Sequence, residues 1–265
     1  MSNNEIGVSV LITAFNEEEY IKGAVESIQK QTVSDWELVV VDDGSTDRTY
    51  EIVDRIAEAD PRIRLFESEH VGRADALNIG LRKARGRFIA ILDADDRARR
   101  NRLEKQAQYL QEHPEIGVVG AGCQFCDHDT DETWSWIPPE TSSSVRRYAL
   151  LGMPIPHTTI MFRRLVLDHI CGYRDHEYKD YDFVVRALKY VDGCNLQEIL
   201  VDLHVHDDSV MGSLGGIDSL RKTVKSRIYA LRSLFPSYLI PLYAPLIFIG
   251  IAHKAFRIFV QERKV

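Results

Sequence analysis

The chain has 265 residues, of which 45% are hydrophobic and 28% are charged. This composition is typical of a globular protein and excludes a disordered chain. The net charge of −7 argues against a nucleic-acid partner held by bulk electrostatics. Four cysteines include a single C-x-x-C pair, Cys123 and Cys126, which is half of a zinc site, so we expect structural thiols.

Charge is unevenly distributed along the chain. Between Leu220 and Val265 lie nine of the 33 Lys and Arg residues but only one of the 40 acidic residues, so the preceding part carries a charge of −15. The N-terminal MSNNEIG lacks the basic and apolar parts of a signal peptide, and we therefore expect the protein in the cytoplasm.

In the first hundred residues, buried strand patterns alternate with helical ones. Apolar runs rich in β-branched residues predict strands at Gly7–Thr13, Trp36–Asp43, 62–68 and 87–95. Between them, apolar residues at helical spacing predict helices over residues 16–31, 44–60 (capped by Ser45) and 72–84. This alternation predicts an α/β fold, with parallel strands joined by crossover helices on both faces of the sheet.

After Leu103 the pattern becomes mixed. A helix at Arg102–His113 precedes a strand at Gly117–Phe125 and a loop or hairpin tip at 127–134. Helix, strand, helix and strand are then predicted at 142–151, 157–164, 181–191 and 195–206. The clearest compositional break is Ser213–Gly216, which precedes the basic tail.

Polar residues follow three of the predicted parallel strands, where an open sheet binds its ligands. The first helix begins with Asn16 and Glu17–Glu19, in the place of the G-x-G-x-x-G of a dinucleotide-binding fold. Three glutamates at a helix start repel a bare phosphate. The sequence therefore argues against a dehydrogenase.

The run FIAILDADD ends in Asp93, Asp95 and Asp96, which repel one another unless a positive charge lies among them. Mg²⁺ and Mn²⁺ take oxygen ligands, and Mg²⁺ usually needs only one or two carboxylates plus substrate phosphates. We therefore expect a divalent cation here. The alternative is a solvated acidic turn neutralised by the basic stretch Arg97–Arg100.

Four blocks resemble the successive motifs of family 2 glycosyltransferases: VSVLITAFNEEEYIKGAVESIQKQT, ELVVVDDGSTDRT, GRADALNIGLRKARGRFIAILDADD and YKDYDFVVRAL. Their order and spacing are intact, and the resemblance covers about residues 6 to 210. It implies an inverting enzyme of the GT-A fold, with a mostly parallel sheet, that uses a nucleotide-sugar donor. It also implies a catalytic domain at 1–215, with a nucleotide-binding half at about 1–100 and an acceptor half at about 101–215, followed by a tail at 216–265.

The resemblance assigns a wall around the nucleotide base to Thr13, Ala14 and Phe15, with Glu17 nearby. Asp42 and Asp43 match an acidic pair, one member of which accepts a hydrogen bond from a base ring nitrogen. A carboxylate facing a ring N–H suits uracil or thymine, so UDP is favoured. The alternative is a turn that caps the next helix, since DDGSTD has good turn chemistry.

A third block contributes Arg73, which resembles a family position beside the base and diphosphate, together with Asn78 and Gly80. A surface arginine is the alternative for Arg73.

In LDADD the resemblance implies a D-x-D element, in which one aspartate touches the ribose and another binds the metal, Mn²⁺ or Mg²⁺. We expect Asp95 on the metal with Asp93 or Asp96 in support, and Ala94 at the substrate. His206 resembles a histidine that closes the metal site, but the aromatic residue and the arginine that accompany it in the family are absent here. A plain surface histidine is the alternative.

Inverting transfer needs one base to deprotonate the acceptor hydroxyl, while the metal stabilises the departing nucleoside diphosphate. In YKDYDFVVRAL, Asp180 matches the aspartate base of the family's Glu-Asp pair, although Lys179 replaces the glutamate and should lower the pKa of the base. Asp182 is then the helix cap. The alternative is that both aspartates merely cap the helix.

The acceptor is expected to be a hydroxyl of a glycan or lipid-linked sugar, with Trp134, Trp136 and His157 as candidate stacking residues. Between Ser233 and Ala252 the tail has 20 uncharged residues, three of them prolines, flanked by basic residues. This pattern favours peripheral docking of 220–265 on the cytoplasmic face of a membrane, over packing on the catalytic domain or on a homodimer partner, and over a membrane span.

Two rival functions remain at this point. One is a metal-dependent sugar nucleotidyltransferase, which would need a basic, glycine-rich loop after the first strand. The other is a non-catalytic nucleotide-sugar-binding relative, which Lys179 leaves open.

Overall fold

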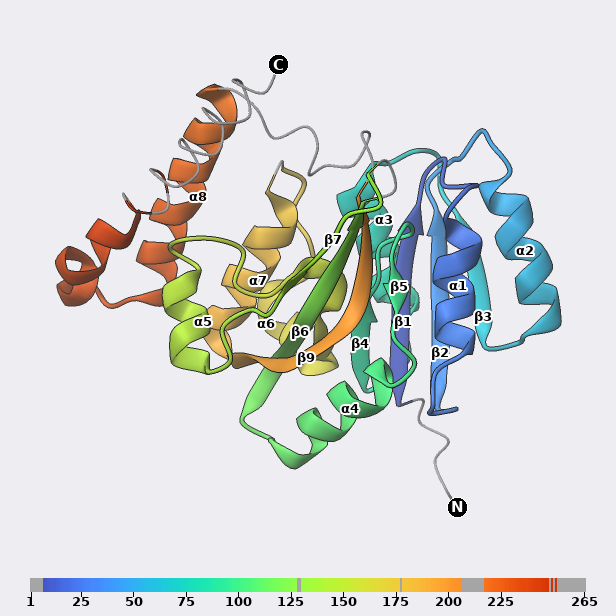
Figure 1. Cartoon of the computed structure of the whole chain (residues 1–265), viewed down its shortest axis with the longest axis horizontal. Helices are drawn as coiled ribbons and strands as arrows, with labels where there is room; N and C mark the ends of the chain where they lie inside the picture. Colours follow the sequence, from blue (N-terminus) through green and yellow to red (C-terminus); the bar gives the residue numbers. More distant parts are fainter. Residues whose placement is uncertain are drawn as a thin grey trace.

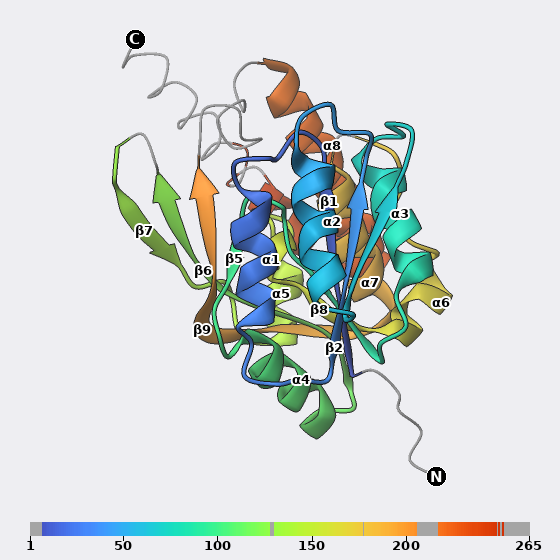
Figure 2. The ribbon, with the colours of Figure 1, turned by 90° about the vertical axis from the view of Figure 1, so that its right-hand side faces the viewer.

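One mixed sheet organises the computed structural model of the protein, which describes residues 7–127, 130–176, 178–205, 217–247, 249 and 251. In the described part the strand order is β3-β2-β1-β4-β8-β6-β9-β5, and β7 pairs with β6 (Figures 1 and 2). The strands are β1 (Val8–Ala14), β2 (Trp36–Asp42), β3 (Ile63–Glu67), β4 (Phe88–Ile91), β5 (Arg97–Ala98), β6 (Ile116–Asp127), β7 (Thr133–Trp136), β8 (Met161–Arg163) and β9 (Asp192–Val205).

The first four strands are parallel, as the sequence predicts. In the register of β1 against β2, Ala14 lies opposite Asp42, and Val8 of β1 lies opposite Phe88 of β4. Because parallel strands end at the same edge of the sheet, the loops after β1, β2 and β4 converge. The predicted acidic residues follow these strand ends.

In the second half the sheet changes direction. β8 runs antiparallel to β4, and β6 runs antiparallel to β8 but parallel to β9. The single strand predicted at 157–164 is divided into a 3₁₀ turn, η1 (His157–Thr159), and the short strand β8. The turn is hard to recognise in the sequence, because Thr158 and Thr159 are β-branched and the whole turn is buried like the strand that follows it.

Helices cover both faces of the sheet, which confirms the predicted α/β fold. Apolar side chains of α1, α2 and α4 pack on one face, and those of α3, α5, α6 and α7 pack on the other. The helices are α1 (Ile21–Gln29), α2 (Thr49–Ala59), α3 (Arg73–Lys83), α4 (Arg102–Glu112), α5 (Ser142–Tyr148), α6 (Leu167–Ile170), α7 (Lys179–Tyr190) and α8 (Ile217–Leu234). Gly80 brings α3 close to β1, because a Cβ at this position would meet the side chain of Leu11 at 2.0 Å.

The described part of the tail packs against α7 and the residues that follow α5. Ala230 and Leu231 of α8, with Ile247, share an apolar cluster with residues of α7 and with the two residues that directly follow α5, Ala149 and Leu150. Helix α8 lies at one end of the molecule (Figure 1). Leu242 and Ile249 point outward, with 68% and 59% of their surface exposed. Among the helices described, none is both long and apolar enough to cross a membrane.

Candidate active site

A cavity of about 390 Å³ lies at the strand edge where β1, β2 and β4 end. Besides these three loops, the start of α3 and the end of β9 contribute to its lining. Ten of the predicted site residues line it: Thr13, Ala14, Phe15, Glu17, Asp43, Arg73, Asp93, Ala94, Asp95 and Asp96.

Three other predicted residues are placed outside the cavity lining, and a fourth, His206, is not described. Asp42 is buried beside the cavity, and Asn78 holds the backbone of Tyr173 through both its amide oxygen and its amide nitrogen. Asp180 lies in the first turn of α7, and its contact with the cavity runs through His157. His206 lies outside the residues that the structure describes.

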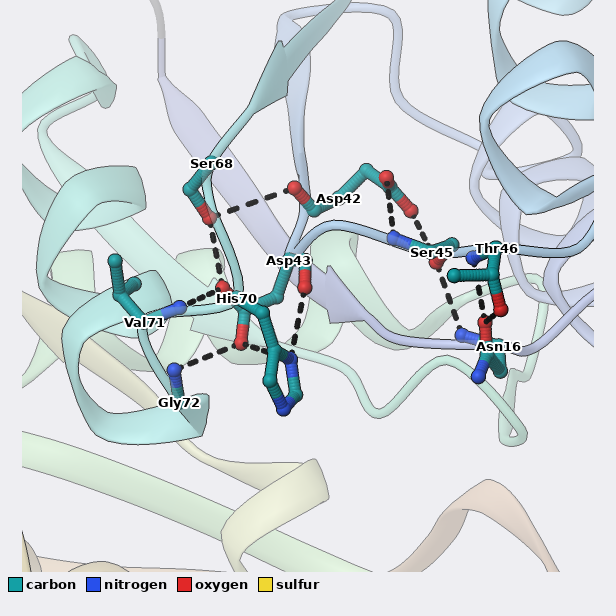
Figure 3. Close-up of polar contacts among 9 residues, drawn as sticks. All are labelled: Asn16, Asp42, Asp43, Ser45, Thr46, Ser68, His70, Val71 and Gly72. Atoms are coloured by element: carbon teal, nitrogen blue, oxygen red, sulfur yellow. Dashed lines mark hydrogen bonds and ion pairs between the residues drawn. The ribbon is translucent and has the colours of Figure 1, made fainter.

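The Asp43 carboxylate organises the loop before α3 (Figure 3). Its Oδ1 accepts hydrogen bonds from the Ser68 hydroxyl at 2.8 Å and from the Val71 amide at 2.8 Å, and its Oδ2 accepts one from the Gly72 amide at 2.9 Å. Gly72 has a φ of +89°, a backbone conformation that favours glycine. Asp43, which lines the cavity, therefore fixes the loop that delivers Arg73.

Asp42 points the other way and ties the loops after β1 and β2 together. Its carboxylate accepts hydrogen bonds from the Ser45 amide and hydroxyl, and Ser45 Oγ accepts one from the Asn16 amide (Figure 3). The amide oxygen of Asn16 accepts one from Thr46. Ser45 therefore connects the two loops by hydrogen bonds. Its prediction as a helix cap is wrong, because α2 begins only at Thr49.

His70 is a cavity residue that the sequence analysis missed. Its ring lies 4.0 Å from the ring of Phe15, centroid to centroid, and its Nδ1 lies 3.1 Å from the carbonyl oxygen of Asp43. It has a left-handed backbone with φ of +45°. The two rings form an aromatic wall beside the Asp43 carboxylate. The only sequence signal is its place two residues before Gly72, which precedes α3.

Arg73 and Asp93 form the shortest ion pair at the site, with Arg73 Nη2 and Asp93 Oδ1 2.6 Å apart. The Asp93 charge raises the pKa of Arg73 despite burial. Burial alone would raise the pKa of Asp93, but Arg73 and His157 together hold it below its ordinary range. The pair therefore stays ionised, and the alternative of a mere surface arginine does not describe Arg73.

Two further cavity carboxylates, Asp96 and Glu17, have too little positive charge nearby to offset their burial. Burial raises the pKa of Asp96 well above its ordinary value of 3.8, and the charges of Asp93 and Asp95 raise it further. Burial, followed by the charges of Asp95 and Asp93, raises the pKa of Glu17 from 4.5 to about 7. This end of the sheet therefore carries more negative charge than its own cations offset.

A buried arginine lies beneath the cluster. Arg102 is fully buried, and its guanidinium donates to the carbonyl oxygen of Ile91 and to the side chain of Gln106. Burial lowers its pKa to about 10, opposed by the charges of Asp96 and Asp93. Arg99, which the acidic-turn alternative assigns to the cluster, instead pairs with Asp202 at 2.8 Å.

Strand β9 closes the far side of the cavity. The backbone amide of His204 donates to Asp96 Oδ1 at 3.1 Å, and His204 Nδ1 contacts the carbonyl oxygen of Asp95. The end of β9 is thereby fixed against the aspartate cluster. Residues just beyond it, including His206, are outside the described part.

Asp180 and Asp182 differ sharply in their surroundings. Asp182 is buried and its Oδ2 accepts a hydrogen bond from Arg186 Nε at 2.6 Å, one turn along the helix. Its prediction as the helix cap is wrong, because this ion pair takes the carboxylate. The side chain of Asp180 is 31% exposed, and its Oδ1 lies 3.5 Å from His157 Nε2.

The oxygen-rich lining fits a hard divalent cation. Among the described residues, the cavity is lined by five carboxylates against a single arginine, Arg73, and Mg²⁺ and Mn²⁺ prefer oxygen ligands. Within the same part of the chain, no three His, Cys, Asp or Glu side chains already form a metal cage. Since Mg²⁺ usually takes only one or two protein carboxylates along with substrate phosphates, the cluster suits such an ion.

The predicted acceptor residues are dispersed. Trp134 is 43% exposed on β7 and stacks on Phe125, with ring centroids 5.1 Å apart. Trp136 is partly buried and lies against Tyr148. His157 is only 7% exposed and lies inside the site, so it offers no open face to a sugar.

The comparisons with known proteins identify the family. The family model described as Glycosyl transferase family 2 matches residues 9–170. An uncharacterized glycosyltransferase of Haemophilus influenzae is 30% identical over 232 residues, 86% of this chain and 87% of that relative. The chain therefore belongs to glycosyl transferase family 2.

Other relatives agree with this assignment. A second Haemophilus influenzae glycosyltransferase, also uncharacterized, is 31% identical over 75% of this chain, and the chain spans 65% of its length. The amylovoran biosynthesis glycosyltransferase AmsE of Erwinia amylovora is 28% identical over 76% of this chain and 77% of the relative.

Solved structures support the fold. Residues 1–349 of S. aureus TarS in complex with UDP-GlcNAc superpose with a TM-score of 0.72 at 20% identity, over 92% of this chain and 72% of that one. The mannosyltransferase PcManGT from Pyrobaculum calidifontis, in complex with GDP-Man and Mn²⁺, gives a TM-score of 0.69 at 22% identity, over 94% and 72%. At such identities the likeness shows the GT-A fold alone.

Glu17 should give the metal-free protein a measurable pH dependence of stability. Because its pKa is raised from 4.5 to about 7 on folding, the folded chain binds this proton more tightly, and its contribution to stability is lost as pH rises through that window. After a discount for partial exposure, we expect Glu17→Gln to remove about 1 kcal/mol of this decline. Urea unfolding at several pH values measures it.

The matched control is Glu19→Gln, at an exposed position of the same loop, which should keep the wild-type slope. A Glu17→Gln protein with an unchanged slope would contradict the assignment.

Proposed function

We propose that the protein is an inverting glycosyltransferase of the hexosyltransferase type. It moves a sugar from a nucleoside diphosphate sugar, with a UDP-sugar favoured, to a hydroxyl of a glycan or lipid-linked acceptor. The observation that carries this proposal is the cavity in which Asp95 and Asp96 lie beside the Arg73–Asp93 ion pair, with Asp180 linked to Asp93 through His157. The family assignment favours sugar transfer over the nucleotidyltransferase alternative.

For the nucleotide we propose Asp43 over Asp42 as the acceptor of the base N–H. Asp43 lines the cavity, and its Oδ2 accepts a single close hydrogen bond, from the Gly72 amide. Both oxygens of Asp42 are taken by Ser45. Phe15 and His70 supply flat faces beside it, against which a base can stack.

For the diphosphate we propose a Mn²⁺ or Mg²⁺ ion held by Asp95 and Asp96, with His206 as a further candidate ligand. When bound, such an ion stabilises the negative charge of the departing nucleoside diphosphate. Arg73 lies in the same cavity and adds a fixed positive charge for the phosphates. Asp93, which is paired with Arg73, is the candidate for the ribose contact.

For the transfer step we propose Asp180 as the base. Inversion needs one carboxylate to accept the acceptor's proton as the hydroxyl oxygen attacks the anomeric carbon, which releases the nucleoside diphosphate. Asp180 is partly exposed at the first turn of α7, apart from the aspartate cluster, whereas Asp182 is committed to Arg186.

For the location we propose the cytoplasmic face of a membrane, with peripheral contact through 220–265. The outward side chains of Leu242 and Ile249 support this docking. Part of the tail packs on α7 and on the residues that follow α5. This packing is compatible with docking, since a docked tail then fixes the catalytic domain near a lipid-linked acceptor. A homodimer through the same apolar side chains is the alternative.

A panel of UDP- and GDP-sugars with Mn²⁺ tests the proposal. Slow hydrolysis of the preferred donor should release the nucleoside diphosphate, and that donor should raise the melting temperature. We expect a UDP-sugar to give both signals. A response to GDP-sugars alone would overturn the nucleotide assignment, and a chain that neither binds nor cleaves any donor would support the non-catalytic alternative.

Asp180→Asn should lower turnover at least about 1,000-fold, because the amide cannot accept the proton. Affinity for the nucleotide sugar should be nearly unchanged, as measured by calorimetric titration. Asp175→Asn, an exposed aspartate of the preceding loop, is the matched control and should remain active. An active Asp180→Asn enzyme would refute the assignment of the base.

A further inference from the structure

His157 lies between two carboxylates that come from opposite halves of the domain. Its Nδ1 is 3.7 Å from Asp93 Oδ1, at the end of β4, and its Nε2 is 3.5 Å from Asp180 Oδ1, at the start of α7. The ring is 7% exposed. A single buried imidazole is therefore the link between the donor-side aspartate and the proposed base.

Two atoms in this link are buried without a hydrogen-bond partner among the described residues: His157 Nδ1 and Asp180 Oδ1. Unpaired buried polar atoms are rare in native proteins and call for a specific explanation. Each of these atoms belongs to an ion-pair contact that is a few tenths of an ångström too long for a hydrogen bond. Catalytic hydrogen bonds are often long in free enzymes and tighten in the substrate complex.

The imidazole is held from behind by Tyr173. The Tyr173 hydroxyl lies 2.9 Å from His157 Nε2, and the two rings meet edge to face, with centroids 5.6 Å apart. Burial, with the nearby charge of Asp180, raises the pKa of Tyr173 well above 10.0, so the phenol keeps its proton. Asn78 fixes the Tyr173 backbone, and Phe183 of α7 stacks on the Tyr173 ring at 4.3 Å.

The support of His157 by Tyr173 also suggests a role for Asn78, which does not line the cavity. Asn78 belongs to α3, the helix that delivers Arg73, and its side chain forms hydrogen bonds with the backbone of Tyr173. The donor-side helix and the ring that supports His157 are thereby joined. Movement of one relative to the other would break both hydrogen bonds of the Asn78 amide.

We propose that His157 is a positioning residue for the transfer reaction. It holds one oxygen of the Asp180 carboxylate at a fixed separation from Asp93, so that the other oxygen faces the acceptor hydroxyl. This inference rests on the proposed function, in which Asp180 is the base and Asp93 contacts the donor. A misplacement of about 1 Å at a reacting group costs about 100-fold in rate, so the link matters for turnover.

The test uses the full chain with Mn²⁺ and the preferred UDP-sugar of the wild type, and it follows UDP release, UDP affinity and melting temperature. His157→Leu should lower kcat about 100-fold while UDP affinity changes less than about 3-fold. His157→Gln keeps a side-chain N–H that can reach one carboxylate, and it should recover turnover to within about 10-fold of the wild type. His169→Leu, the same change at an exposed site, is the control.

The inference is overturned if His157→Leu turns over like His169→Leu, if its UDP affinity falls as much as its kcat, or if His157→Gln is no better than His157→Leu. If His157→Leu does not fold, Tyr173→Phe decides: it should lower kcat about 10-fold with UDP affinity unchanged, and an unchanged kcat overturns the inference. A wild type that cleaves no donor overturns the proposed function itself. An active wild type with any of the variant outcomes above overturns only the inference about His157.

Discussion

The site depends on how the negative charge at one edge of the sheet is balanced. Parallel strands deliver Asp93, Asp95 and Asp96 to the same cavity as Glu17, where burial makes each uncompensated charge costly. Arg73 pairs with Asp93, and Arg102 lies buried below the cluster. The raised pKa values of Asp96 and Glu17 indicate that these two cations do not complete the balance. The fold therefore keeps a place for positive charge from outside.

The surrounding loops are built to keep that arrangement fixed. Asp42 and Asp43 share a strand end but serve different loops, because one carboxylate faces Ser45 and the other faces the amides before α3 (Figure 3). The left-handed backbones of Asn16 and Gly72 let the chain turn at these points. As a result, hydrogen bonds hold the loops of the proposed donor side in place. The proposed base, Asp180 on α7, is linked to this side through His157.

The sequence predicts the donor side better than the acceptor side, for physical reasons. Continuous apolar runs define β1, β2 and β4, and short polar motifs follow each of them, so the residues that converge at the strand ends can be read directly. Side-chain direction is not encoded in spacing, so Asp42 and Asp43 could not be separated without their hydrogen-bond partners. Asp182 and Arg186, by contrast, are spaced i, i+4 in a predicted helix, so their ion pair had a local signal in the sequence.

The second half is harder because its contacts are long-range. The 3₁₀ turn at His157–Thr159 has the composition of a strand, and its role follows only from meeting Asp93 and Asp180 in space. His70 carries no pattern beyond its place two residues before Gly72. The tail illustrates the same limit, since its apolar stretch suited both a membrane surface and the protein. Its packing on α7 and on the residues after α5 emerges only from the tertiary contacts.

The central claim is that a pocket this acidic accepts a pyrophosphate group only together with a divalent cation. Calorimetric titration of UDP into the full chain, with Mn²⁺ and then with excess chelator, tests it most directly. The account predicts that chelation weakens binding at least about 100-fold, since uncompensated carboxylates then face the phosphates. Equal affinity in both conditions would contradict it.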